Sequence, residues 1–219
     1  MGNIIDKQWA GRVLVYTLGM LVLAFGVVFA INSGLGVSSV TSLPFVISLV
    51  TGVNIGVCVA AIFTLFILIQ VVILRNEFRY IDFTQIIFTF MFGYFVAFAQ
   101  MLIGDFRIPT YAGQLVMLAI SIILLTCGLT MYIEARLVNM PAEGLVASIA
   151  YKAGTAFHTI KMPLDCFIVT ISVTLSFMFL GELHGIREGT ILSALFVGRL
   201  MPVMKRLIMP VISAAGIKL

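Results

Sequence analysis

The chain has 219 residues, of which 62% are hydrophobic and only 10% are charged, and its formal net charge is +4. Soluble domains carry about 25% charged residues, and no soluble fold of this size buries so much apolar surface. The composition therefore predicts a protein of the lipid bilayer, and the scattered Lys and Arg residues suit topology determination rather than nucleic-acid binding.

Eight apolar runs predict helices, because no alternation with a period of two suggests a β-barrel. Six of the runs are long enough to cross a hydrocarbon core of ~30 Å. The second and sixth runs are too short, because about 13 helical residues span only ~20 Å. The expected helices, in chain order, are Val13–Ile31, Ser39–Val50, Asn54–Leu74, Thr84–Ile103, Ala112–Ile133, Pro141–Ala153, Thr159–Leu180 and Gly189–Met204.

The two halves of the chain resemble each other. At an offset of 102 residues Gly52 matches Gly154, and at an offset of 105 residues Gly93 matches Gly198. Both halves also share the order long, short, long, long. We therefore expect a first membrane repeat in residues 1–104, a second in residues 105–204, and an interfacial C-terminal tail in residues 205–219.

The basic residues favour an inverted arrangement of these repeats. If all eight segments span, four basic residues lie on one side and six on the other. If the two short segments instead enter and leave by one face, only Arg107 and Arg187 oppose eight others. The second arrangement obeys the positive-inside rule better, and it places both termini in the cytoplasm. It therefore favours six transmembrane helices plus two half-helices. The alternative is eight spans in two parallel repeats. The eight residues are Lys7, Arg12, Arg75, Arg79, Arg136, Lys152, Lys205 and Arg206.

Each short segment begins with residues that suit a helix N-terminus. Residues 38–41 are rich in hydroxyl groups, and in residues 139–141 we expect Asn139 to cap the helix and Pro141 to lie in its first turn. In inverted repeats such half-helices carry partial positive charge to the membrane midplane. We predict that the two starts meet there and hold an anionic or carbonyl-bearing group. The candidate binding residues are Ser38, Ser39, Thr41 and Asn139.

Ionisable residues are concentrated in the second half. No residue from Val13 to Leu74 is charged, whereas the matching interval of the second half holds several carboxylates and amines. A charge at the bilayer centre costs at least ~2.5–3.5 kcal/mol, so an intramembrane carboxylate is a candidate functional group. Glu143, in the first turn of the sixth helix, is the principal candidate for a protonatable group or a ligand of a cation or amine. The alternative is that Glu143 caps its own helix.

Three residues of the seventh helix complete the candidate site. Lys161 and Asp165 lie four residues apart on one helix face and can neutralise each other, either at a solute site or as an interfacial pair. His158 is a candidate proton relay, although a lone interfacial histidine is the favoured interpretation. We find no catalytic motif, metal-ligand spacing or CxxC pair, so neither enzymatic activity nor a cofactor is expected.

Several short motifs of the first half point to a family. Arg12 precedes the first span, residues 18–26 read Leu-Gly-Met-Leu-Val-Leu-Ala-Phe-Gly, residues 33–39 read Ser-Gly-Leu-Gly-Val-Ser-Ser, and residues 51–56 read Thr-Gly-Val-Asn-Ile-Gly. In these motifs the chain resembles the YczE/YitT-type family of small bacterial integral membrane proteins. The resemblance implies a multi-pass protein of the bacterial cell membrane that acts in transport, and it assigns no site residues.

The sequence thus predicts a transporter or channel for a small polar solute, with Glu143 as the coupling or selectivity group. The alternative is a membrane-embedded substrate-binding subunit of a larger transport complex. Membrane lipids and the solute are the expected partners. The sequence leaves open whether the chain also forms a homo-oligomer or docks on an energising partner complex.

Overall fold

The computed structural model describes residues 2–53, 55–78, 80–183, 185–214 and 217. These residues form helices and no strand. Asn54 and Arg79, and the side chain of Lys7, lie outside the described part. The elements are α1 (Gly2–Ser33), α2 (Ser39–Thr51), α3 (Ile55–Leu74), η1 (Arg75–Glu77), η2 (Tyr80–Thr84), α4 (Gln85–Ile103), α5 (Tyr111–Glu134), α6 (Pro141–Ala153), α7 (Phe157–Leu180) and α8 (Glu188–Ala214).

The helices lie where the sequence predicts them, with two long extensions. α1 begins at Gly2 rather than near Val13, and α8 continues to Ala214 rather than ending at Met204. Hydropathy marks only the apolar part of a helix, and no Gly lies between Met204 and Ala214 to end this one. The predicted boundary at residue 205 is therefore not a break in the helix.

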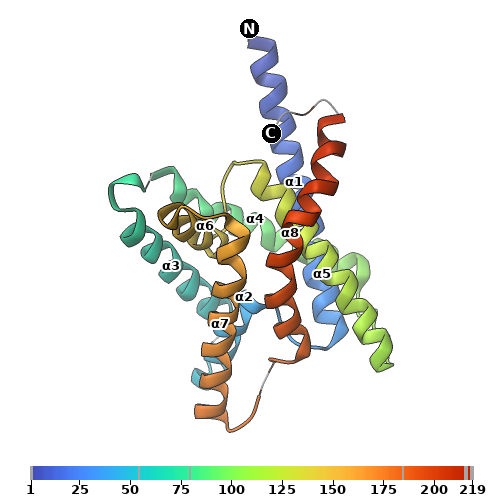
Figure 1. Cartoon of the computed structure of the whole chain (residues 1–219). Helices are drawn as coiled ribbons and strands as arrows, with labels where there is room; N and C mark the ends of the chain where they lie inside the picture. Colours follow the sequence, from blue (N-terminus) through green and yellow to red (C-terminus); the bar gives the residue numbers. More distant parts are fainter. Residues whose placement is uncertain (1, 54, 79, 184, 215–216, 218–219) are drawn as a thin grey trace.

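Within the described residues, five helices are long and apolar enough to cross a membrane, and they belong to α1, α3, α4, α5 and α7. α8 has 27 residues, but it carries Arg199, Lys205 and Arg206 and is not among the five. It nevertheless packs beside α5 and α7 (Figure 1). α2 and α6 have 13 residues each, which is ~20 Å of helix and too short to cross.

α1 and α5 form the antiparallel pair at the centre of the molecule. Gly19 lies against Tyr132 and Gly26 against Leu125, so residue numbers rise along α1 as they fall along α5. The two backbones approach so closely that a Cβ atom at Gly128 would overlap the backbone nitrogen of Leu23. Small residues at such crossings are typical of helix packing in membranes.

The other helices pack in matching pairs around this centre. α2 contacts α7 and α3, and α6 correspondingly contacts α3 and α7. α4 packs on α1 as α8 packs on α5. One pair does not match among the described residues. α7 packs on α8, but their counterparts α3 and α4 have no comparable contact.

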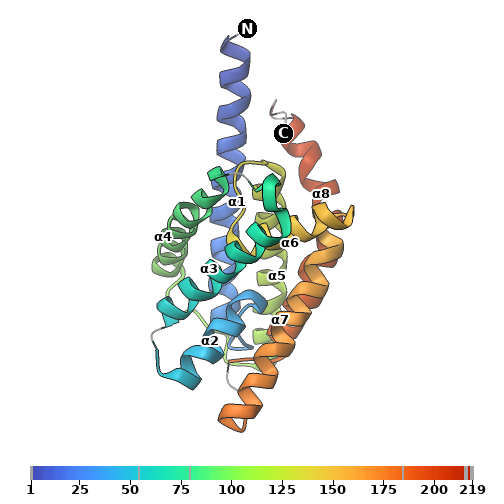
Figure 2. The same ribbon diagram turned by 90° about the vertical axis from the view of Figure 1, so that its left-hand side faces the viewer.

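The two short helices begin inside the bundle and point toward opposite ends of it. α6 lies toward the end that holds both chain termini, and α2 lies toward the other end (Figures 1 and 2). Each ends at a glycine in the left-handed region, Gly52 with φ 72° and Gly154 with φ 63°. These two glycines match in the sequence, so the correspondence between them extends to their role as helix terminators.

Candidate functional site

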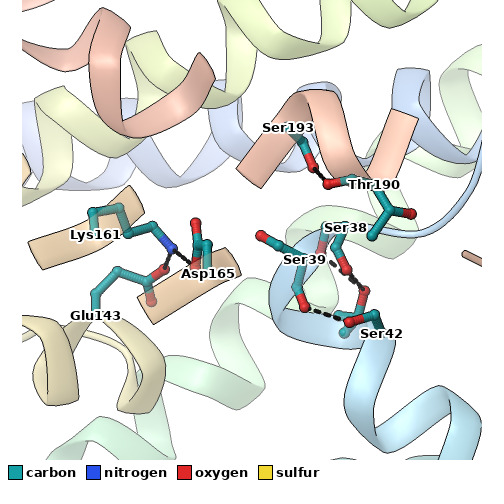
Figure 3. Close-up of polar contacts among 9 residues, drawn as sticks. Ser38, Ser39, Ser42, Glu143, Lys161, Asp165, Thr190 and Ser193 are labelled. Atoms are coloured by element: carbon teal, nitrogen blue, oxygen red, sulfur yellow. Dashed lines mark hydrogen bonds and ion pairs between the residues drawn. The ribbon is translucent and has the colours of Figure 1, made fainter. Parts of the chain in front are cut away.

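A cavity of about 160 Å³ lies between the first turns of α2 and α6. Most of its wall is apolar, and its polar groups come from α2, α6, α7 and α8 (Figure 3). Six of the eight predicted site residues line it: Ser38, Ser39, Thr41, Glu143, Lys161 and Asp165.

The charged residues of the cavity form one connected group, in which Lys161 lies between two carboxylates. The Nζ atom of Lys161 is 2.8 Å from Oδ1 of Asp165 and 3.6 Å from Oε1 of Glu143 (Figure 3). Lys161 is 3% exposed, Asp165 1% and Glu143 8%, so the group is enclosed by protein rather than placed at the surface. We call these three residues the charge triad.

The charge triad is not electrically balanced. Two ionised carboxylates and one ammonium leave one negative charge. No other Lys or Arg of the described residues lines the cavity. Because uncompensated charge is costly away from water, the site needs one further positive charge, either a proton or a bound cation.

A carboxylate stands at the start of each half-helix. Glu143 lies in the first turn of α6 itself, and Asp165 of α7 lies beside Ser39 at the start of α2 (Figure 3). Carboxylates at these positions complement the partial positive charge of the helix N-termini. An anionic ligand, which the sequence also allowed, would have to approach both of these carboxylates.

The predicted cap of α6 is wrong. The N-cap residue is Met140, which has an extended backbone, and no side chain caps the helix. Pro141 is the first helical residue, as predicted, so Asn139 lies one position too early to cap. Asn139 instead lines a separate pocket of about 330 Å³ together with Gln70 and Gln85.

His158 also lies outside the cavity. It is exposed at the beginning of α7 and lines a surface pocket of about 860 Å³ with Lys205 and Arg206 of α8. The structure therefore does not bring His158 together with the charge triad. Within the described residues, no group of His, Cys, Asp and Glu side chains could hold a metal ion.

Two tyrosines that the sequence analysis missed stand behind Glu143. Tyr132 is 1% exposed, and its hydroxyl lies near the Glu143 carboxylate, although none of the described residues forms a hydrogen bond of good geometry with it. Tyr16 packs edge-on against the Tyr132 ring and donates a hydrogen bond of 2.8 Å to the carbonyl of Val138, just before α6. Both lie within apolar runs, a position that could have marked them as buried polar groups rather than interface anchors.

A pair of buried glutamines holds the first turn of α6 from the other side. The side-chain amides of Gln70 and Gln85 bond to each other at 3.1 and 3.3 Å, and Nε2 of Gln70 donates to the carbonyl of Pro141 at 2.9 Å. Gly144 fits against both amides, since a Cβ atom there would lie 2.6 Å from Oε1 of Gln70. These contacts fix the turn that carries Glu143.

Positions that correspond in the sequences of the two halves line the cavity in pairs. At the offset of 102 residues, Thr41 corresponds to Glu143 and Phe63 to Asp165, and all four line the cavity. The further pairs at this offset are Leu23 and Leu125, Val27 and Leu129, Ser38 and Met140, and Val40 and Ala142; Phe92 and Val197 pair at the offset of 105 residues.

Comparison with known proteins identifies a family but not an activity. The model of DUF6198, described as a family of unknown function, matches residues 10–206. No curated protein and no solved structure matches the chain. The match includes both halves of the chain and every residue that lines the cavity. The description of this family does not mention the YczE/YitT-type family, so the resemblance to that family stays an expectation.

Proposed function

The chain belongs to DUF6198, a family of unknown function, and we propose that it is a transporter of a small polar solute in the bacterial cell membrane. The observation that carries the proposal is the charge triad, buried in a cavity between two half-helix starts. Soluble or structural roles give no reason to keep three ionisable side chains inside an apolar bundle, because intramembrane charge is costly and marks solute and ion pathways.

We propose that the fold consists of two inverted repeats, with α8 as a sixth span and both termini on the cytoplasmic side. The antiparallel course of α1 and α5 supports an inversion, and so do the matched helix contacts. The paired positions in the cavity wall support a pseudo-two-fold axis that passes through the site. Transporters with this design bind solute at the repeat interface and alternate access by rocking one repeat against the other.

The first turn of α6 contributes Ala142 and Glu143 to the wall of the cavity. Gly144 of the same turn lines the separate pocket that also contains Gln70 and Gln85. In the proposed mechanism, movement of α6 together with Glu143 would connect the pocket to the cavity. Solute would then reach the charge triad from one face of the membrane at a time.

Transport by purified protein in liposomes tests the proposal. A thermal-shift screen of small polar solutes first identifies compounds that stabilise the protein, and uptake of those compounds is then measured. Glu143→Gln should reduce uptake to the level of empty liposomes. Glu134→Gln is the matched control, because Glu134 pairs with Lys205 at 2.6 Å and does not line the cavity.

Unchanged uptake by Glu143→Gln would remove the charge triad from the mechanism and overturn the proposal. Solute binding without uptake, together with a co-purifying ATPase, would instead support the alternative of a substrate-binding subunit. Uptake by the isolated protein excludes that alternative.

A further inference from the structure

We propose that the solute is a small organic ammonium ion that exchanges for one proton on Glu143, so that the protein is a proton–amine antiporter. This inference rests on the proposed transport function and deepens it by naming the solute class and the coupling ion. It follows from the charge balance of the cavity, the different distances of its two carboxylates from Lys161, and the apolar side chains in its wall.

The charge balance sets the number of ligands. The charge triad lacks one positive charge, and either one proton or one monovalent cation restores neutrality. Binding both would leave an excess positive charge. Because either imbalance is costly in the bilayer interior, the site should hold one or the other at a time.

The geometry points to Glu143 as the exchanging carboxylate. Asp165 is held by Lys161 at 2.8 Å, whereas Glu143 is 3.6 Å from the same ammonium and is the looser partner. The titratable groups around Glu143 are Tyr16 of α1, Tyr132 of α5, and Lys161 and Asp165 of α7. The amides of Gln70 in α3 and Gln85 in α4 contact its neighbours Pro141 and Gly144 and carry no charge. The Tyr132 hydroxyl lies behind Glu143 and can donate a hydrogen bond to that carboxylate when it is ionised.

The wall of the cavity favours an organic cation over a metal ion. Hard metal ions take six or more oxygen ligands. The oxygens of the cavity wall belong to two carboxylates and four hydroxyls, and Asp165, Ser38, Thr41 and Ser193 already bond within the protein. The apolar side chains of Leu23, Val27, Phe63 and Phe92 supply no oxygen. A buried water molecule needs roughly 10–15 Å³ of cavity volume. A cavity of about 160 Å³ therefore admits a solute of about ten non-hydrogen atoms. The aromatic rings also offer favourable faces to a cation.

The two halves of the chain divide the contacts with such a solute. The second half provides the charge triad, which would hold the ammonium group. At the corresponding positions of the first half stand Thr41 and Phe63, which would contact the apolar body. In the exchange, the ammonium enters with its own proton, the carboxyl proton of Glu143 leaves to water, and no covalent bond to carbon changes.

Binding and proton release by the purified protein test the inference. The probe is 2-phenylethylamine, which is a cation at about pH 7 because alkyl amines have pKa values near that of Lys. The neutral 2-phenylethanol, the anionic phenylacetate and sodium chloride are the comparison compounds. We expect the amine alone to raise the Tm, and a pH indicator in weak buffer to report about one proton released per amine bound.

Equal stabilisation by phenylacetate or 2-phenylethanol, or amine binding without proton release, would overturn the inference. A response to sodium alone would show that the cation is a metal ion and would also overturn it. If some other solute is transported in a manner that depends on Glu143, the inference fails while the proposed transport function survives. If no transport depends on Glu143, both fail.

Two variants localise the effect. Glu143→Gln cannot release a proton and should lose both the amine-induced Tm shift and the proton signal, whereas Glu134→Gln should retain both. Asp165→Asn is the second variant if Glu143→Gln does not fold, because it removes the negative charge that the amine neutralises. We expect Asp165→Asn to bind the amine at least tenfold more weakly, and wild-type affinity in this variant would contradict the proposal.

Discussion

Replacing Lys161 by Met tests whether its ammonium compensates the two buried carboxylates of the charge triad. The substitution keeps an unbranched apolar stem but leaves Glu143 and Asp165 facing each other without an ammonium. Removing one partner of a buried ion pair costs about 3–5 kcal/mol, because the remaining charge has no compensation. We expect Lys161→Met to lower the free energy of unfolding by about that amount.

The double variant Lys161→Met/Asp165→Asn separates charge imbalance from lost packing. Asp165→Asn alone gives up a charge-assisted hydrogen bond, which costs about 1.5–3 kcal/mol. In the double variant Glu143 is the one remaining charge of the triad, and protonation can neutralise it. The double variant should therefore be more stable than the sum of the single effects predicts, by about 1–3 kcal/mol.

Unfolding in mixed micelles with a rising fraction of denaturing detergent, followed by loss of helical circular dichroism, measures these free energies. The cycle needs the wild type, both single variants and the double variant under identical conditions. Additivity within about 0.5 kcal/mol would mean that the two residues do not interact. The reasoning about the charge triad would then be wrong, whatever the effect of Lys161→Met alone.

Two further predictions concern the scaffold around the site. Gly128→Ala should destabilise the protein by about 1–3 kcal/mol, because its Cβ atom would overlap the backbone nitrogen of Leu23 in α1. Gly93→Ala, whose Cβ atom would have no described residue within 4 Å, should be neutral or stabilising by up to about 1 kcal/mol in the same assay. Tyr16→Phe removes the hydrogen bond to the Val138 carbonyl and should cost about 1 kcal/mol. It should also weaken solute binding, since that bond holds the segment before Glu143, and unaltered binding in a folded variant would show that the segment does not need it.

The helices and the two short segments could be predicted because hydropathy and helix-end chemistry are local properties. Pro141 marked the first residue of α6, and the matching glycines Gly52 and Gly154 marked the ends of both half-helices. The cap was wrongly assigned to Asn139, because an Asn two residues before a Pro resembles a cap even where the residue between them takes that position. The lengths of α1 and α8 were underestimated because charged helical turns carry no apolar signal.

The charged residues of the site could be predicted from the sequence, whereas the residues that hold them in place could not. Intramembrane carboxylates are rare enough to be recognised individually, which identified Glu143 and Asp165. Tyr16 reaches a carbonyl 122 residues away, and Gln70 reaches one 71 residues away, so neither contact leaves a local pattern in the sequence. His158 is the converse case, because its closeness to Lys161 in sequence does not place it in the cavity.

The cavity also explains why the charges can be confined to one half of the chain. Positions that correspond in the two halves face the same space, so an acid at one of them serves the whole site. Carboxylates at Thr41 and Phe63 as well would raise the negative charge of the cavity from one to three with no further basic residue to balance them. The first half can therefore keep a hydroxyl and a phenyl ring where the second half has Glu143 and Asp165. The charged residues of the cavity wall therefore all belong to the second half, while the first half adds hydroxyl and apolar groups to the same space, a combination that suits the ammonium group and the body of a small amine.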